Sequence, residues 1–200
     1  MAYETVSAVI LAAGESRRMG QPKLLMPWGK TNVLGQVVAT ISTAGVSDIL
    51  IVTGGGYEQI EDMLAGLAKT YPVRTTYNPD YNRDGMLSSV KAGLSALGTK
   101  PQAALIALGD QPQVHEETVR NICTAYLKTK AALVIPSFEN QRGHPWLAGR
   151  PLWEEILALP RSATARHFLN DHAGQVAYIP ADNSILQDLD TPEDYSRLRP

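Results

Sequence analysis

The sequence predicts an α/β fold of three layers, in which helices cover both faces of a mainly parallel sheet. Two observations carry this prediction. Short apolar runs end in polar loops that contain glycine, and amphipathic segments of helical period separate these runs. Such apolar runs are typical of strands that are buried on both faces. Their alternation with helices favours parallel strands that are joined by helical crossovers.

Predicted strands and helices alternate most regularly in the first half of the chain. Strands are predicted at Val6–Ala12, 48–53 and Val73–Tyr77, and the second of them ends at Gly54, Gly55 and Gly56. Between these strands lie two helices, whose apolar residues recur every three or four positions. The first has Thr31 or Asn32 as its N-cap and ends near Gly45. The apolar positions of the two helices are Val33, Leu34, Val37, Val38 and Ile41, then Ile60, Met63, Leu64 and Leu67.

The second half continues the pattern and then loses it. A helix over 86–97 precedes a strand at Ala103–Leu108, and Glu116–Thr129 is predicted as the next helix. A strand over 131–135 is expected to end at Pro136, because proline lacks a backbone donor. The stretch 136–175 is dotted with glycine and proline and is predicted as a variable acceptor-binding region. A strand over 176–179 and a helix that opens at 191–194 complete one domain over 1–200.

Composition narrows the classes of protein to which the chain can belong. With 200 residues, a net charge of −2 and no long basic run, it does not suit a nucleic-acid-binding protein. We expect the single cysteine, Cys123, to be a buried helical residue. No signal peptide is evident at the N-terminus, and no apolar run approaches the roughly 18 residues that a membrane span needs. The default location is the cytoplasm, with no membrane partner.

The loop after the first strand has the composition of a phosphate-binding loop. It runs from Leu11 to Lys23 and combines two glycines and Ser16 with the cations Arg17, Arg18 and Lys23. Within Leu11 to Lys23 there is no Gly-Lys-Ser/Thr, and no G-x-G-x-x-G follows the strand. The loop is therefore neither a Walker A motif nor a dinucleotide-binding fingerprint.

This loop resembles L-x-[AG]-G-x-S-x-R-M-G-x-x-K, the signature of the nucleotidyltransferases that make molybdenum-cofactor dinucleotides. Every fixed position is filled in Leu11 to Lys23. The resemblance implies a Rossmann-like sheet of the nucleotide-diphospho-sugar transferase (GT-A-like) type. It also implies that the loop residues Leu11, Ala12, Ala13 and Gly14 bind the nucleotide base, and that Arg18 and Lys23 bind the triphosphate.

Position 13 indicates which nucleotide is used. Relatives that transfer guanylyl groups tend to have glycine there, whereas those that transfer cytidylyl groups resemble Leu11 to Gly14 of this chain. The methyl group of Ala13 is expected to crowd a purine. The resemblance therefore favours CTP over GTP.

Carboxylates at strand ends suit a magnesium ion. Asp110 directly follows the strand that ends at Leu108, and carboxylate oxygens are hard ligands for Mg²⁺. The segment 109–112, Gly-Asp-Gln-Pro, also matches the cytidylyltransferase branch of the family. The segment 188–194 resembles the family's D-x-D-T-P-E-D ending, which implies Asp190 as the second metal ligand and Asp188 as the reserve. The same segment can be read as a helix start alone.

Three further segments are assigned by position and resemblance. Thr53 and Gly54 end the second strand, where a nucleotide is expected to bind in such sheets. The segment 78–90 resembles the family's N-P-x-(x)n-G-M-x-x-S-[LV], which implies that Gly85 and Ser89 face the nucleotide. Arg142 to Pro145 resemble an R-G-H-P element near the second substrate, which implies that Arg142 and His144 bind it. Relatives commonly carry G-D-x-G-A-R where this chain has 161–166, and only Ala165 and Arg166 match.

Together these resemblances imply transfer of CMP from CTP to the terminal phosphate of molybdopterin, with release of pyrophosphate. Arg18, Lys23 and Asp110 are the predicted catalytic residues, Mg²⁺ is the predicted cofactor, and a molybdenum hydroxylase is a candidate client. Three alternatives stay open. They are a guanylyltransferase of the same cofactor, a sugar or isoprenoid-precursor nucleotidyltransferase, and a non-catalytic carrier of the cofactor.

Overall fold

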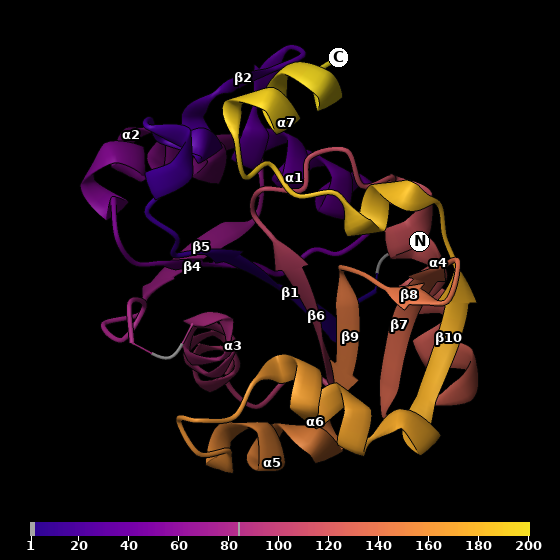
Figure 1. Cartoon of the computed structure of the whole chain (residues 1–200). Coiled ribbons are helices and arrows are strands. Elements are labelled where there is room, and N and C mark those ends of the chain that lie inside the picture. Colours follow the sequence, from indigo (N-terminus) through magenta and orange to yellow (C-terminus); the bar gives the residue numbers. More distant parts are fainter. Residues whose placement is uncertain (1–2, 84) are drawn as a thin grey trace.

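A twisted, eight-stranded sheet lies between two layers of helices (Figure 1). This computed structural model describes residues 3–83 and 85–200, so Met1, Ala2 and Asp84, which belong to segments quoted above, lie outside the described residues. The three-layer α/β architecture predicted from the sequence is confirmed.

The sheet has eight strands in the order β10-β7-β9-β6-β1-β4-β5, and β8 pairs with β7. Most neighbours are parallel, while β9 is antiparallel to both β6 and β7. The strand β1 pairs with β6 on one side and β4 on the other, so it lies inside the sheet. The strands are β1 (Val6–Ala12), β4 (Ile49–Thr53), β5 (Val73–Tyr77), β6 (Ala103–Leu108), β7 (Leu133–Phe138), β8 (Gln141–Arg142), β9 (Trp146–Gly149) and β10 (Val176–Pro180).

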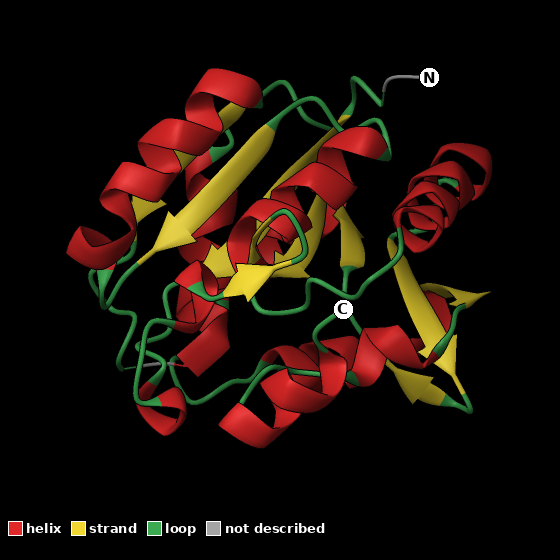
Figure 2. Ribbon diagram, turned by 90° about the horizontal axis from the view of Figure 1, so that it is seen from above, coloured by secondary structure: helices red, strands yellow, loops and turns green. Residues whose placement is uncertain are grey.

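Helices cover both faces of the sheet, as the alternating sequence pattern predicts (Figure 2). One face packs against α1 (Val33–Thr43), α2 (Tyr57–Thr70) and α4 (Glu116–Thr129). The other packs against α3 (Gly85–Ala96), α5 (Trp153–Ala158) and α6 (Ala165–Asp171). Side chains of β1 alternate between these two cores: Ala8 and Ile10 lie in the first, and Val9 lies in the second. This alternation explains why all positions of the strand except Ser7 are apolar.

Shorter elements join these layers. The chain ends in α7 (Pro192–Leu198), whose start is fixed by a capping box between Thr191 and Asp194. The helix start predicted there is confirmed, and Asn32 is the N-cap of α1, since its side chain accepts a 2.7 Å hydrogen bond from the Gly35 amide. The remaining short elements are β2 (Pro27–Trp28), β3 (Thr31–Asn32) and the 3₁₀ turns Arg17–Met19, Lys23–Leu25, Arg150–Leu152, Ala173–Gln175 and Asn183–Leu186.

The expectation that Pro136 ends a strand is wrong, because β7 runs through it to Phe138. On one side of β7, β9 pairs only with Leu133 and Val134, and β8 pairs only with Ser137 and Phe138. Pro136 lies between these two pairings, where no strand partner requires its missing N–H. Its carbonyl still accepts a 3.1 Å hydrogen bond from the Gly143 amide.

The region 136–175 has more regular structure than its composition suggests. It contributes β8, β9, α5 and α6, none of which the sequence analysis predicts. The strand β9 inserts between β6 and β7, so this region supplies part of the sheet interior as well as a surface. Across the described residues, none of the helices has the length and apolar character needed to cross a membrane.

Candidate active site

The predicted site residues gather where adjacent parallel strands end. The strands β4, β1 and β6 are neighbours, so the loops after Thr53, Ala12 and Leu108 meet at one edge of the sheet. The Gly109 amide donates a 2.9 Å hydrogen bond to the Leu11 carbonyl. A Cβ atom at Gly109 would lie 3.0 Å from that carbonyl oxygen, so glycine permits the close approach of the two loops.

Lys23 lies at the centre of a charged cluster at this edge. Its Nζ contacts the Asp110 carboxylate and lies 3.5 Å from Asp190 Oδ1. The other oxygen of Asp190, Oδ2, forms an ion pair with Arg18 Nη2 at 2.9 Å. The structure thus brings together Arg18, Lys23, Asp110 and Asp190, which come from three distant parts of the chain. The Lys23 side chain is only 14% exposed, so solvent screens its pairing with Asp110 less than it would screen a surface ion pair.

Amide side chains hold the C-terminal acids against the strand edge. Gln113 Nε2 donates to the carbonyl of Ser184 at 3.3 Å and also to the carbonyl of Gln187. Gln111 Nε2 donates a 2.8 Å hydrogen bond to Asp188 Oδ1. These contacts span more than 70 residues of sequence and bring the segment that carries Asp188 and Asp190 to Asp110.

Asp188 differs from Asp190 in its partners. Part of its residue surface is open to solvent, yet loss of hydration raises the pKa of its carboxyl group, and the negative charges of Asp110 and Asp190 raise it further. The hydrogen bond from Gln111 and the charge of Lys23 act in the opposite direction. Asp188 therefore lies close enough to the other two acids for their charges to act on it, while Asp190 shares Lys23 directly with Asp110.

The donor set fits a divalent cation that protein and nucleotide hold jointly. Within residues 3–83 and 85–200, no three His, Cys, Asp or Glu side chains come together as a complete metal site. Mg²⁺ commonly takes only one or two carboxylates from the protein and completes its shell with phosphates and water. Asp110 and Asp190 provide such a pair, because the Lys23 ammonium already shows that both can approach one cation.

The opposite side of the loop packs against the end of β4. Ala13 is buried, and a Cβ atom at Gly54 would lie 2.8 Å from the Ala13 methyl group and 2.6 Å from Tyr81 Cβ. At Gly55 a Cβ atom would lie 2.3 Å from Glu15 Cγ. Two glycines are thus required at the end of β4 for the backbone to approach the loop so closely. Gly14 is exposed at the same place.

Thr53 and Ser89 lie deeper than a nucleotide contact requires. Thr53 is buried, and its hydroxyl donates a 3.2 Å hydrogen bond to the Thr76 carbonyl. Ser89 is buried too, and its hydroxyl accepts a 3.0 Å hydrogen bond from Asn78 Nδ2. Gly85, by contrast, is exposed at the start of α3 with a φ of +58°. In this structure both hydroxyl groups bond within the protein, and contact of Thr53 and Ser89 with a nucleotide remains a prediction.

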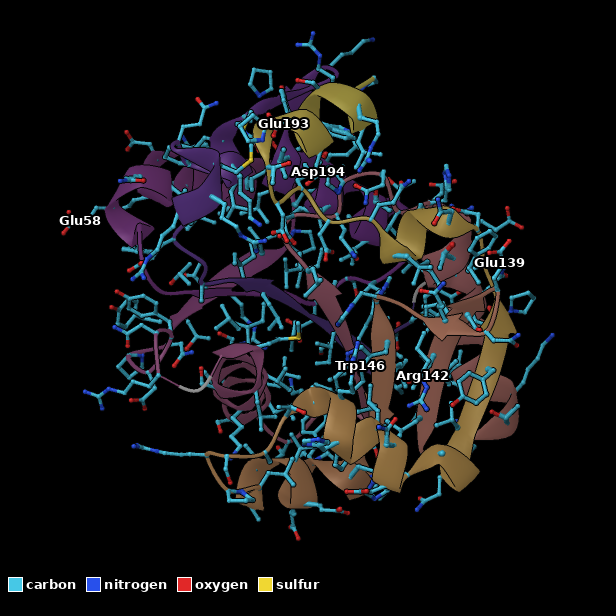
Figure 3. All side chains as sticks on the ribbon, viewed as in Figure 1. Glu58, Glu139, Arg142, Trp146, Glu193 and Asp194 are labelled. Carbon is cyan, nitrogen blue, oxygen red and sulfur yellow. The ribbon has the colours of Figure 1, made fainter. Side chains whose placement is uncertain are left out.

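The structure places the predicted acceptor residues in a cavity of about 520 Å³. Arg142 and His144 line it together with Met86 of α3 and Arg166 of α6. Figure 3 labels Arg142 and Trp146 in the same part of the molecule, above α6 in this view. Ala165 and Arg166, which alone match the family's G-D-x-G-A-R, line the same cavity. Met86 follows Gly85, so the cavity borders the predicted nucleotide side.

His144 lies between the cavity and the charged cluster. It is partly buried, its amide donates a 3.2 Å hydrogen bond to the Ile185 carbonyl, and Gly143 packs tightly against the same residue. Loss of hydration lowers the pKa of His144 to about 4, although the charge of Asp110 acts to raise it. The ring is therefore neutral near pH 7 and suits a hydrogen-bonding role.

Glu15, in the loop from Leu11 to Lys23, is held by two side chains that no sequence motif identifies. Glu15 accepts a 3.0 Å hydrogen bond from the Tyr81 hydroxyl and a 2.6 Å contact from Arg17 Nε. Arg17 first and then Tyr81 lower the pKa of the Glu15 carboxyl group. Glu15 and Arg17 fill variable positions of the loop signature, and Tyr81 is 66 residues from Glu15 in sequence. No local pattern connects residues so far apart.

The chain is similar to known proteins over most of its length. The family model described as MobA-like NTP transferase domain matches residues 8–176. The molybdenum cofactor cytidylyltransferase of Escherichia coli (strain K12) is 29% identical over 193 residues, which are 95% of this chain and 93% of that protein. A nicotine blue oxidoreductase of Paenarthrobacter nicotinovorans is 30% identical over 201 residues, or 96% of each chain.

Solved structures agree with this assignment. Rv0371c from Mycobacterium tuberculosis H37Rv superimposes with a TM-score of 0.81 at 27% identity, covering 96% of this chain and 97% of that one. A nucleotidyl transferase from Methanothermobacter has a TM-score of 0.80 at 26% identity, covering 98% and 96%. A structure of Rv0371c in complex with manganese has a TM-score of 0.76 at 25% identity, covering 98% of each chain.

Proposed function

Because the chain belongs to the MobA-like NTP transferase family and is a nucleotidyltransferase, we propose that it transfers CMP from CTP to a molybdopterin-type acceptor. The products are the cytosine dinucleotide form of the cofactor and pyrophosphate. We propose the cytoplasm as the site of this reaction. A molybdenum hydroxylase as the client that receives the product remains a prediction from resemblance.

The observation that carries the proposal is the shared position of Lys23 between Asp110 and Asp190 at the strand edge. Arg18 adds a second cation beside Asp190. A triphosphate that binds here meets two cations, and it can compete with the carboxylates for them. The cluster therefore supplies positive charge to phosphates and frees two carboxylates for a metal.

In the proposed reaction an oxygen of the acceptor's terminal phosphate attacks the α-phosphorus of CTP. The new P–O bond forms as the bond from the α-phosphorus to the bridging oxygen breaks, and pyrophosphate leaves with that oxygen and its electron pair. No covalent intermediate with the protein is required. Such transfers depend mainly on alignment and on neutralising developing charge. Arg18 and Lys23 neutralise the departing pyrophosphate.

Asp110 and Asp190 would hold Mg²⁺, with Asp188 beside them. When bound, the ion supplies charge neutralisation to the phosphates and helps to orient them. The manganese complex of Rv0371c is a property of that protein, and it supports a divalent cation for this chain. Asp188 keeps its hydrogen bond from Gln111 in this arrangement, so it is the less direct of the three acids.

The choice of CTP rests on Ala13. Its methyl group packs against Gly54 at the base of the loop, and a larger purine ring is expected to meet it. The name of the Escherichia coli relative, which matches nearly the whole chain, supports both the cytidylyl donor and the molybdopterin acceptor. The cavity lined by Arg142 and His144 provides room for that acceptor next to the strand edge.

Similarity alone does not separate the activities found among relatives. The nicotine blue oxidoreductase matches as much of the chain at nearly the same identity as the cytidylyltransferase. What favours transfer is the pair of carboxylates beside Lys23 and Arg18, which can hold the divalent cation that phosphate transfer uses.

The test is incubation of the protein with Mg²⁺, molybdopterin and each of CTP, GTP, UTP and ATP. We expect pyrophosphate release with CTP and formation of the cytosine dinucleotide in equal amount. Release with GTP instead would assign a guanylyltransferase. Binding of molybdopterin without pyrophosphate release would assign a carrier. Pyrophosphate release from CTP with a sugar phosphate or an isoprenoid-precursor phosphate, but not with molybdopterin, would contradict molybdopterin as the acceptor.

A nucleotide panel in thermal unfolding tests the donor separately. A ligand that binds the folded chain raises its apparent stability by mass action, by roughly 2.7 kcal/mol at a hundredfold excess over its dissociation constant. We expect CTP with Mg²⁺ to raise the melting temperature more than the other three nucleotides. A larger rise with GTP would overturn the argument from Ala13.

A further inference from the structure

The cavity lined by Arg142 and His144 has in its wall a tryptophan whose indole N–H the proposed reaction has not used. Trp146 is the first residue of β9 and lines the cavity, and it is only 2% exposed. Among the described residues its Nε1 has no hydrogen-bond partner. A buried donor without a partner costs on the order of 1–3 kcal/mol, so such groups are rare in folded proteins unless a ligand or water completes them.

A second tryptophan shows that the fold can satisfy an indole donor in the same core. Trp153 is also buried in this layer, and its Nε1 donates a 3.1 Å hydrogen bond to the Ala148 carbonyl. Trp146 and Trp153 thus share one hydrophobic layer but differ in the use of their N–H groups. The difference points to the cavity beside Trp146.

The rest of the cavity wall favours an anion. Arg142 and Arg166 line it from β8 and α6, and none of the described lining residues carries a carboxylate. Asn140, Gln141 and Asn170 add neutral polar groups. Glu139 is close in sequence but lies at the outer edge of the molecule, away from Trp146 (Figure 3). The cavity therefore combines two guanidinium groups with a buried donor and offers no competing acid.

We propose that Trp146 is a specificity-determining residue for the acceptor. Arg166, which lines the same cavity, binds another part of the acceptor. The indole N–H donates to a carbonyl oxygen or ring nitrogen of a planar heterocycle, and the guanidinium group of Arg166 binds the anionic part. The inference rests on the proposed function and deepens it, because it names the groups that distinguish this acceptor from a sugar phosphate. Trp146 Nε1 is itself covered, so binding includes a small side-chain shift, which is common at ligand sites.

The tryptophans allow a direct spectroscopic test. The chain has three tryptophans, which give three indole N–H signals in a ¹⁵N–¹H NMR spectrum of the full-length protein. The probe is 6-hydroxymethylpterin phosphate, added without CTP, and the Trp146 signal is assigned with Trp146→Phe. We expect this signal to move on titration while the Trp153 signal stays in place. An unmoved Trp146 signal at millimolar probe would overturn the inference.

A matched pair of variants tests the same idea in the reaction. Trp146→Phe and Trp153→Phe both lose a similar part of a buried ring, but only the first removes the unpartnered donor. We expect Trp146→Phe to raise the KM for molybdopterin about tenfold, the size of one strong hydrogen bond, with kcat and the KM for CTP unchanged. Trp153→Phe should leave all three parameters within about twofold. Equal acceptor KM values in the two variants would contradict the role of Trp146.

Arg166→Gln supplies an independent arm, with Arg120→Gln as its control. Arg120 lies on α4, on the other face of the sheet, and pairs with Glu116 at 3.1 Å. We expect only Arg166→Gln to raise the acceptor KM. If the wild-type chain fails to transfer CMP to molybdopterin but the pterin phosphate moves the Trp146 signal, the proposed function fails and the cavity assignment stands. If the wild-type chain transfers CMP to molybdopterin and Trp146→Phe has no effect on this transfer, the proposed function stands and the cavity assignment fails.

Discussion

The charged strand edge around Lys23 and the cavity lined by Arg142 and Arg166, which we propose bind the nucleotide and the acceptor, differ in how their charges are paired. At the strand edge, Lys23 and Arg18 are paired with Asp110 and Asp190 within the protein. In the cavity, Arg142 and Arg166 face a wall without carboxylates, and Trp146 has a donor without a partner among the described residues. We infer from this difference that a ligand at the first region would exchange partners with the protein, whereas a ligand in the cavity would supply a partner to the Trp146 donor.

The largest effect is expected from breaking the charge pairing at Asp110. Asp110→Asn keeps the shape of the side chain but removes one of the two carboxylates proposed to hold the metal. We expect kcat to fall by roughly 10³, about 4 kcal/mol in the barrier, with the fold retained. Pyrophosphate release measures the rate, and Asp62→Asn on the exposed surface of α2 is the control. A rate within tenfold of the wild type would remove Asp110 from the metal site.

The next effect concerns the cation between the acids. We expect Lys23→Ala to lower kcat/KM for CTP by about a hundredfold, close to 2.7 kcal/mol, because the triphosphate loses its most buried positive charge. Lys30→Ala changes an exposed lysine just beyond the same loop and should have no effect. Steady-state kinetics with varied CTP distinguish the two variants. Unchanged CTP kinetics in Lys23→Ala would show that Lys23 does not bind the triphosphate.

His144 lines the cavity and lies close enough to Asp110 for that charge to act on it, so its protonation links the two regions. Its pKa of about 4 in the folded chain lies below the ordinary value near 6.5, so the unfolded chain binds more protons between these values. Stability from this group is present above pH 6.5 and is lost as the pH falls towards 4. From pH 7 to pH 4.5 we expect the wild type to lose on the order of 2 kcal/mol more than His144→Asn. Urea unfolding of both proteins at both pH values measures the free energy of unfolding. Equal losses of this free energy in the two proteins would contradict a lowered pKa of His144 in the folded chain.

The smallest effect is expected at Asp188. It is held by Gln111 and does not share Lys23, so Asp188→Asn should lower kcat by only about three- to tenfold. Asp190→Asn, which removes the carboxylate that shares Lys23, should lower it by about a hundredfold. Parallel assays of the two variants rank the acids. A larger loss in Asp188→Asn would exchange their proposed roles.

How much the sequence predicted depends on how local each signal is. The strand β1 and its loop could be predicted because one short segment carries both the apolar run and the residues proposed to bind phosphate. The helix start at Thr191 was predictable for the same reason. By contrast, β9 has only four residues, and its place between β6 and β7 depends on pairings with distant strands. No periodicity in 136–175 reveals that placement.

The site shows the same limit. The pairing of Asp110 with Lys23 joins two segments that motifs identify separately, so the sequence predicted the members but not their contact. Tyr81 reaches Glu15 through packing on Gly54 and Gly55, which is a property of the folded backbone. The state of the Trp146 donor depends on what surrounds it in three dimensions. Burial and hydrogen-bond satisfaction are not encoded in any single residue's neighbourhood in sequence.

The measurement that tests the central claim most directly is the stoichiometry of CMP transfer by the wild-type chain and by Asp110→Asn. With Mg²⁺, molybdopterin and CTP labelled at the α-phosphate, the account predicts one labelled cytosine dinucleotide for each pyrophosphate released by the wild type. It predicts a roughly 10³-fold slower appearance of both products with Asp110→Asn. Label that stays in CTP with the wild-type chain, or transfer that proceeds equally fast in the variant, would contradict the account.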